Sequence, residues 1–185
     1  NSPSTFFPDA ASAAGRGNST GWMYSRAGGE GSYTAGGHIQ QRHEMTNTSL
    51  TAMAYSFDFT ISQGSLSTYN SDSFVGSEHA IAAYNVAIKL NNNVIWESAA
   101  SLLTDATGSS LVQSGTPLGT YSTSNFYSWG VYTDTLSLGI FNPGESFILE
   151  YDIFTEALGD TGYVSCGNGG YGGDGYGGGF GDLPE

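Results

Sequence analysis

Alternation of hydrophobic and polar residues is the dominant pattern of this chain, and it is clearest over residues 126–154. In two runs, around 136–140 and 147–153, apolar side chains occupy every second position. A period of two places one set on a buried face of a strand and the other toward water. Between the runs, Pro143 and Gly144 suit the second and third positions of a type II turn. The pattern predicts a long antiparallel hairpin.

Shorter segments with the same alternation cover much of the remaining chain, and residues 50–62 are the clearest of them. Residues 80–90 are ambiguous, because their apolar positions fit a helix as well as a strand. The run Asn91-Asn92-Asn93 that follows favours a hairpin with residues 94–103, since Asn tolerates the left-handed conformation. The other expected segments are short strands at 22–27, 38–45 (at a sheet edge or with one face in solvent), 111–113 and 118–122, a glycine-rich connection at 28–37 and a polar loop at 69–78.

Many short strands, frequent turn signals and the lack of a convincing long helix predict an all-β protein. We expect an antiparallel β-sandwich, jelly-roll-like, as a single domain over residues 21–160. Residues 1–20 lack periodicity and contain Pro and Gly breakers, which indicates a flexible N-terminal arm. Residues 161–185 form a Gly/Tyr-rich tail, which we expect to stay flexible unless a partner orders it, because glycine loses much backbone entropy on folding.

Charge and cysteine content narrow the function classes. The 185 residues carry four Lys plus Arg against 17 Asp plus Glu, a net charge of −13. Nucleic acid and anionic lipid need cations to neutralise phosphate, so neither is expected as a direct partner. No apolar run predicts a membrane span. The single Cys166 excludes an intramolecular disulfide, and leaves a free thiol or a bond to another chain. A polar composition low in charge, together with a start at Asn1, favours an exported, extracellular protein.

The sequence contains no convincing catalytic group. His38 and His43 are five apart, so one strand would place them on opposite faces, where they cannot share a metal. Glu150 and Asp152 share a strand face and could resemble a glycosidase pair, but they are better explained as its polar side. Cys166 has no neighbouring cation to lower its pKa. We therefore expect no enzyme activity.

Calcium is the cofactor that the composition allows, because it takes six to eight oxygen ligands from carboxylates and carbonyls. The candidate ligands are Asp72 with Glu78, Asp105 in its turn, and Asp174 or Asp182 in the tail. None of them matches a known calcium-loop pattern.

A carbohydrate-binding module is the alternative function. Trp22, Trp96 and Trp129 could form a platform on which sugar rings of an extracellular polysaccharide stack. The competing interpretation, which we favour for Trp96 and Trp129, is that they fill the core. Asn18 and Asn47 match the glycosylation acceptor pattern, which is common by chance.

Self-assembly is the function we expect. The edges of a sheet carry unpaired backbone groups, and an extended arm of a neighbouring subunit can satisfy them. Phe6 and Phe7 would anchor the N-terminal arm. Tyr171, Tyr176 and Phe180 would anchor the tail as the alternative donor. A head-to-tail contact of this kind does not close, so it predicts filaments rather than rings.

Three stretches resemble exported β-rich bacterial proteins of the PEP-CTERM class: MTNTSLTAMAYSFDFTISQGSLSTY, AAYNVAIKLNNNVIWESAASL and YSWGVYTDTLSLGIFNPGESFILEYDIFTEA. The resemblance covers roughly residues 45–185. The end Leu183-Pro184-Glu185 is similar to the first part of the class's sorting motif, while the hydrophobic segment and basic tail that follow the motif are missing. The resemblance implies processing by an exosortase and a non-enzymatic role at the cell surface or in a biofilm or floc matrix.

Overall fold

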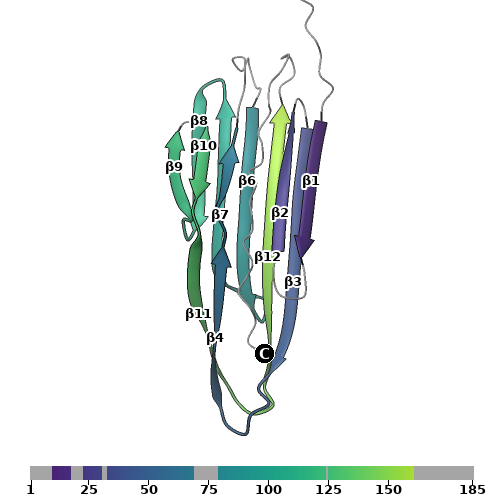
Figure 1. Cartoon of the computed structure of the whole chain (residues 1–185), viewed down its shortest axis with the longest axis vertical. Coiled ribbons are helices and arrows are strands. Elements are labelled where there is room, and N and C mark those ends of the chain that lie inside the picture. The colour runs from purple at the N-terminus through teal and green to yellow at the C-terminus, as the bar shows by residue number, and fades with distance from the viewer. Residues whose placement is uncertain (1–9, 18–22, 31–32, 69–78, 124, 161–185) are drawn as a thin grey trace, which may run out of the picture.

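The computed structural model describes residues 10–17, 23–30, 33–68, 79–123 and 125–160 (Figure 1). These residues form strands and turns without a helix, and every strand pair is antiparallel. The predicted all-β, antiparallel class is therefore confirmed. The strands are β1 (Ala10–Gly17), β2 (Met23–Glu30), β3 (Tyr33–Thr46), β4 (Met53–Ile61), β5 (Gly64–Ser67), β6 (His79–Leu90), β7 (Asn93–Asp105), β8 (Gly108–Gly115), β9 (Gly119–Thr123), β10 (Phe126–Trp129), β11 (Tyr132–Phe141) and β12 (Ser146–Asp160).

The first layer is a five-stranded sheet in the order β3-β12-β6-β7-β8. The ambiguous residues 80–90 lie in β6 and form the predicted hairpin with β7. Asn91 and Asn92 make its turn with φ of 50° and 67°, the left-handed values that a tight hairpin with the sheet's twist requires. As predicted, the strand that contains residues 38–45 lies at an edge of its sheet.

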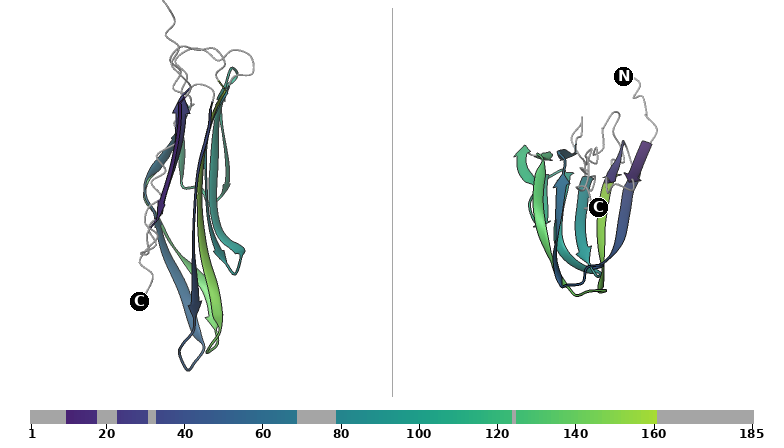
Figure 2. Two further views of the ribbon diagram at one scale, coloured as in Figure 1. Left: turned by 90° about the vertical axis from the view of Figure 1, so that its right-hand side faces the viewer. Right: turned by 60° about the horizontal axis from the view of Figure 1, so that its bottom comes forward.

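The second layer consists of β4 paired with β11, and of β5, β10 and β9. Because β4 continues into β5 and β10 continues into β11, the two pairings form one long ribbon that is interrupted at residues 62–63 and 130–131. Figure 2 shows the two layers face to face, with the chain crossing between them at the lower end.

The predicted hairpin over 126–154 is wrong, although its turn is right. Glu145 N–H donates to the Asn142 carbonyl at 2.9 Å and Gly144 has a φ of 78°, as a type II turn requires. However, β11 pairs with β4, whereas β12 pairs with β3 and β6. The turn therefore carries the chain from one layer to the other, and the rings of Phe141 and Phe147 stack across it with centroids 4.1 Å apart.

Asn47 ties this interlayer turn to the connection between β3 and β4. Its side chain is fully buried, and Nδ2 donates to the carbonyls of Thr51 (3.0 Å) and Phe141 (2.8 Å). Its Oδ1 accepts from the backbone and the hydroxyl of Ser49. Its backbone N–H donates to the Glu145 carbonyl at 2.9 Å. Asn47 thus provides hydrogen-bond partners for backbone groups in both connections between the layers. Buried backbone N–H and C=O groups need such partners.

The N-terminal region differs from the sequence prediction. Residues 10–17, expected to lack regular structure, form β1 and pair along their whole length with β2. The stretch 28–37, expected as a connection, lies mostly within β2 and β3. This β1–β2 hairpin contacts β3 and β12 over the buried Ala35 and Ala157. Segments of Ala, Gly and Ser lack hydrophobic alternation, so backbone pairing between them leaves little trace in the sequence.

The core lies between the two layers and is rich in aromatic rings. Alternation along β12 is as predicted, because Phe147, Leu149, Tyr151 and Ile153 are all buried. The buried residues of the main cluster are Phe57, Phe59, Ile61, Leu66, Ala82, Tyr84, Val86, Ile88, Trp96, Ala100, Leu102, Tyr127, Trp129, Leu138, Phe141, Phe147, Leu149, Tyr151 and Ile153.

Candidate functional site

The two described tryptophans belong to the core. Trp96 packs edge-on against Phe59 with ring centroids 4.8 Å apart, and Trp129 donates its indole N–H to the Ser62 carbonyl at 2.9 Å. Both are 7% exposed. The core interpretation that we favoured for them holds, and neither can form an exposed stacking platform. Trp22 lies outside the described residues.

Glu150 and Asp152 form an ion cluster with Lys89 on the outer face of the five-stranded sheet. Lys89 Nζ lies 2.9 Å from Glu150 Oε1 and also contacts Asp152 Oδ2. His38 Nε2 lies 2.9 Å from the other oxygen of Asp152. The polar face expected at these acids is present, but it is more than a solvated surface: Glu150 is buried and lies between Arg42 and Lys89 in the strand register.

The cluster favours the charged forms of Asp152 and Lys89. Partial burial would raise the pKa of Asp152, but the hydrogen bonds from Lys89 and His38 outweigh burial and lower it. Hydrogen bonds to Asp152 and to Glu150 raise the pKa of Lys89. Because its pKa is lowered, Asp152 is not available as a proton donor at neutral pH. His43 lies on the inner face, stacked on Tyr151 at 5.7 Å, so the two histidines occupy opposite faces as predicted.

No group of three or more His, Cys, Asp or Glu side chains in the described residues could hold a metal ion. Asp105 instead closes the turn between β7 and β8, where its Oδ1 accepts from the backbone and hydroxyl of Thr107. These bonds lower the pKa of Asp105. The other calcium candidates lie outside the described residues, and calcium binding stays a prediction for them: Asp72, Glu78, Asp174 and Asp182.

Of the remaining candidate residues, only Asn47 lies within the described part of the chain. Asn47 cannot accept a glycan in the folded protein, because its side chain is fully buried and its amide nitrogen makes two hydrogen bonds. Asn18 lies outside the described residues. So do all five residues expected to anchor assembly: Phe6, Phe7, Tyr171, Tyr176 and Phe180.

Strand β8 is an open edge that the sequence did not single out. It pairs only with β7 among the described strands, in a continuous register from Gly108 to Gly115. Its sequence, GSSLVQSG, contains no charge and no proline, and most of its side chains are exposed. Natural sheets protect their edges with charges, prolines, bulges or short strands. Strand β8 has no bulge and eight residues, so it lacks all four protections.

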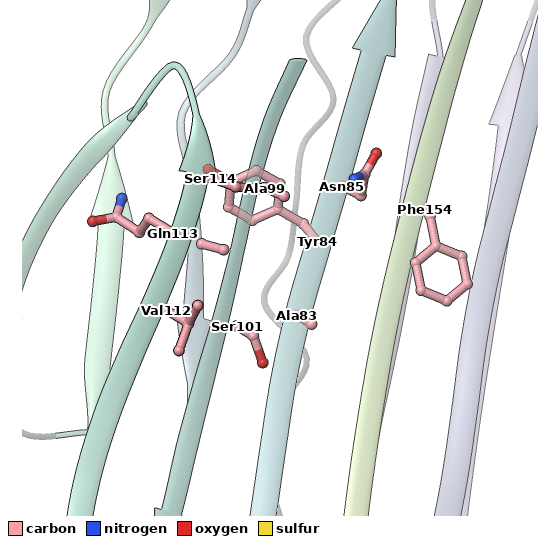
Figure 3. Close-up of a pocket in the computed structure, with 10 residues that line it drawn as sticks. Ala83, Tyr84, Asn85, Ala99, Ser101, Val112, Gln113, Ser114 and Phe154 are labelled. Carbon is pink, nitrogen blue, oxygen red and sulfur yellow. The ribbon is translucent and has the colours of Figure 1, made fainter.

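A shallow hollow lies next to this edge, on the outer face of the same sheet (Figure 3). Its volume is about 240 Å³. The side chains around it come from four neighbouring strands, with Val112 on β8 and Phe154 on β12. The lining residues are Ala83, Tyr84, Asn85, Ala99, Ala100, Ser101, Val112, Gln113, Ser114 and Phe154. No local sequence pattern indicates this site, because the strand register brings its residues together from distant segments.

A scan against protein-family models and a search of the curated proteins gave no match to this chain. The described residues include no helix with the length and apolar character needed to cross a membrane. We therefore base the proposals on the function of this chain on the open edge at β8 and on the hollow beside it.

Proposed function

We propose that this chain is an extracellular structural protein whose subunits assemble into a filament or a biofilm or floc matrix. Each subunit would accept an extended segment of its neighbour along β8. The observation that supports this proposal is the open edge itself: eight residues, uncharged and without a bulge. A strand that adds to such an edge gains main-chain hydrogen bonds along its length.

The donor in this proposal is the N-terminal segment 1–9, with Phe6 and Phe7 as its apolar anchors. Residues 10–17 already pair with β2, which leaves a shorter donor than the arm expected from the sequence. The tail, 161–185, is the alternative donor. The low charge of the proposed acceptor strand also supports the proposal, because a chain of net charge −13 repels its own copies wherever acids meet.

Electron microscopy and sedimentation velocity of the purified protein test the proposal. We expect filaments from the wild type and monomers from the double variant Ser110→Lys/Val112→Lys, because charge on an edge strand opposes pairing. The matched control is Thr48→Lys/Ala52→Lys, which places the same charge on exposed positions of the connection between β3 and β4, outside any strand. Wild-type protein that stays monomeric at high concentration would overturn self-assembly.

Deletion variants then identify the donor. A chain that lacks residues 1–9 should lose assembly, whereas a chain that lacks residues 161–185 should keep it. The reverse result would transfer the donor role to the tail and leave the acceptor strand unchanged.

A further inference from the structure

The hollow on the outer face of the five-stranded sheet has no charged lining. None of the described residues that line it carries a carboxylate, amine, guanidinium or imidazole, although the chain has a net charge of −13. A desolvated anionic ligand would need a cation there, and a cationic ligand would need a carboxylate. The lining therefore selects a neutral ligand.

Two neighbouring rows of the sheet build the hollow. The strand register places Phe154 beside Asn85, Asn85 beside Ala99, and Ala99 beside Ser114. The next row runs from Ala83 to Ser101 to Val112. Strands lie about 4.8 Å apart, so Phe154 and Ser114 face each other across roughly 14 Å. Figure 3 shows the small side chains of Ala83 and Ala99 between the larger ones of Phe154 and Val112.

Phe154 is an exposed aromatic ring that packs against a neighbouring side chain. It is 39% exposed, and the His38 ring lies edge-on to it with centroids 6.3 Å apart. Asn85, its direct neighbour across the strands, is exposed, and no hydrogen bond from another described residue reaches its side-chain amide. An aromatic face, an amide that can both donate and accept, and the hydroxyls of Ser101 and Ser114 thus surround an apolar floor.

This combination fits a sugar ring. A pyranose has an apolar C–H face, which the negative face of an aromatic ring attracts, and a rim of hydroxyls that pair with amide and hydroxyl groups. The hollow, with a volume of about 240 Å³, is large enough for one sugar ring and opens to solvent. We propose that this hollow binds a neutral polysaccharide, with one sugar ring seated between Phe154 and Val112 and bound by Asn85.

A second copy of the chain is the competing occupant, and the surrounding charges disfavour it. Glu156 lies beside Ala83 on the same face, and Glu97 lies beside Ala87 one row further along the strands. Two copies packed through this face would bring these acids close together. A stable protein interface also buries about 800 Å² on each partner, so it would have to include them.

Affinity gel electrophoresis tests the proposal with three neutral polymers in the gel, hydroxyethyl cellulose, galactomannan and dextran, and with polygalacturonate as a charged comparison. We expect at least one neutral polymer to retard the wild type and polygalacturonate to have no effect. Phe154→Ala should weaken the retardation roughly fivefold to tenfold, and Asn85→Ala roughly threefold. Phe126→Ala is the matched control, because Phe126 is similarly exposed, 37%, but lies in the other layer.

Three outcomes would overturn the proposal: no retardation by any neutral polymer, equal retardation of wild type and Phe154→Ala, or an equal loss in Phe126→Ala. Sedimentation velocity of the same variants separates the competing occupant, since a loss of self-association in Phe154→Ala without any polysaccharide binding would assign the hollow to a protein contact. Phe154 and Asn85 lie on the interior strands β12 and β6, so their substitutions leave the residues of the β8 edge unchanged.

Discussion

The two edges of the five-stranded sheet are built in opposite ways. Strand β3 has 14 residues, exposes the charges of Arg42 and Glu44, and contacts the β1–β2 hairpin. Strand β8 has eight residues, no charge and, among the described residues, no strand on its outer side. Both edges run in continuous register with their single partner. By length and regularity alone, β3 would pair with an added strand more readily than β8. Charged side chains and the contact with the β1–β2 hairpin are therefore the features that distinguish β3 from β8.

Each edge is joined to the second layer by hydrogen bonds of one polar side chain. On the β3 side, Asn47 binds the two crossovers with a fully buried amide. On the β8 side, the hydroxyl of Tyr127 accepts from Gln113 Nε2 at 3.0 Å and from the Gly119 N–H at 2.9 Å. Each joint contains a buried residue, Asn47 or Tyr127. Both edges are therefore fixed to the second layer, and β8 is not simply a loose end.

The largest effect on stability is expected at Asn47. Asn47→Leu removes the donor for two backbone carbonyls and the acceptor for Ser49, so we expect a loss of about 3 kcal/mol in the free energy of unfolding. Urea denaturation followed by tryptophan fluorescence measures it. Asn93→Ala is the control, because Asn93 is exposed, and its effect should stay within about 0.5 kcal/mol. Similar losses in both variants would show that the Asn47 joint has no special role.

A smaller loss is expected on the β8 side. Tyr127→Phe keeps the packed ring but leaves the Gly119 N–H and the Gln113 amide without their acceptor, which should cost about 1.5 kcal/mol. The same urea experiment measures it, with Tyr121→Phe on the exposed surface of β9 as the control. A Tyr127→Phe variant as stable as the wild type would mean that water replaces the hydroxyl there.

The ion cluster near β3 should show a smaller, pH-dependent effect. Lys89→Met leaves Glu150 and Asp152 without their cation, and we expect a loss of about 1 kcal/mol at pH 7. The lowered pKa of Asp152 means that its contribution is complete above its unfolded pKa, about 3.9, and is lost as the pH falls through the folded value. The raised pKa of Lys89 means that its contribution is complete below about pH 10.4 and is lost as the pH rises through the folded value.

The difference between wild type and Lys89→Met should therefore be constant from about pH 5 to about pH 10, and shrink at lower pH as Asp152 is protonated and at higher pH as Lys89 loses its proton. Urea denaturation from pH 3 to pH 10 measures the plateau and its acid limit. Arg42→Met, which removes an exposed cation, should show less than about 0.5 kcal/mol at any pH. A difference that grows below pH 4 would contradict the assignment.

The smallest effect on stability is expected from removing the charges that distinguish the edges. Arg42→Ser/Glu44→Ser makes β3 resemble β8, and both residues are exposed, so unfolding should change by less than about 0.5 kcal/mol. Sedimentation velocity should nevertheless detect more self-association than in the wild type, because a second edge is open. Unchanged self-association would assign the protection of β3 to the β1–β2 hairpin instead of to charge.

Local patterns in the sequence predict where most strands lie and where several turns occur. Alternation located β4, β7 and β12, and the turn at Asn91 and Asn92 resolved the ambiguity of β6. Pro143 and Gly144 form the turn that their chemistry requires. These features are local, because a period of two and a positive φ depend on neighbouring residues alone.

Long-range packing sets the partners of strands that are distant in the chain. The same turn serves a hairpin or a crossing between layers, and here it makes the crossing, with Phe141 stacked on Phe147 and the strands on either side paired elsewhere. Long-range packing also placed Trp96 and Trp129 in the core, buried Asn47, and left β8 as an open edge. Phe154 and Asn85 lie side by side only because β12 and β6 pair in one register. Such contacts join segments far apart in the chain, so no local pattern records them.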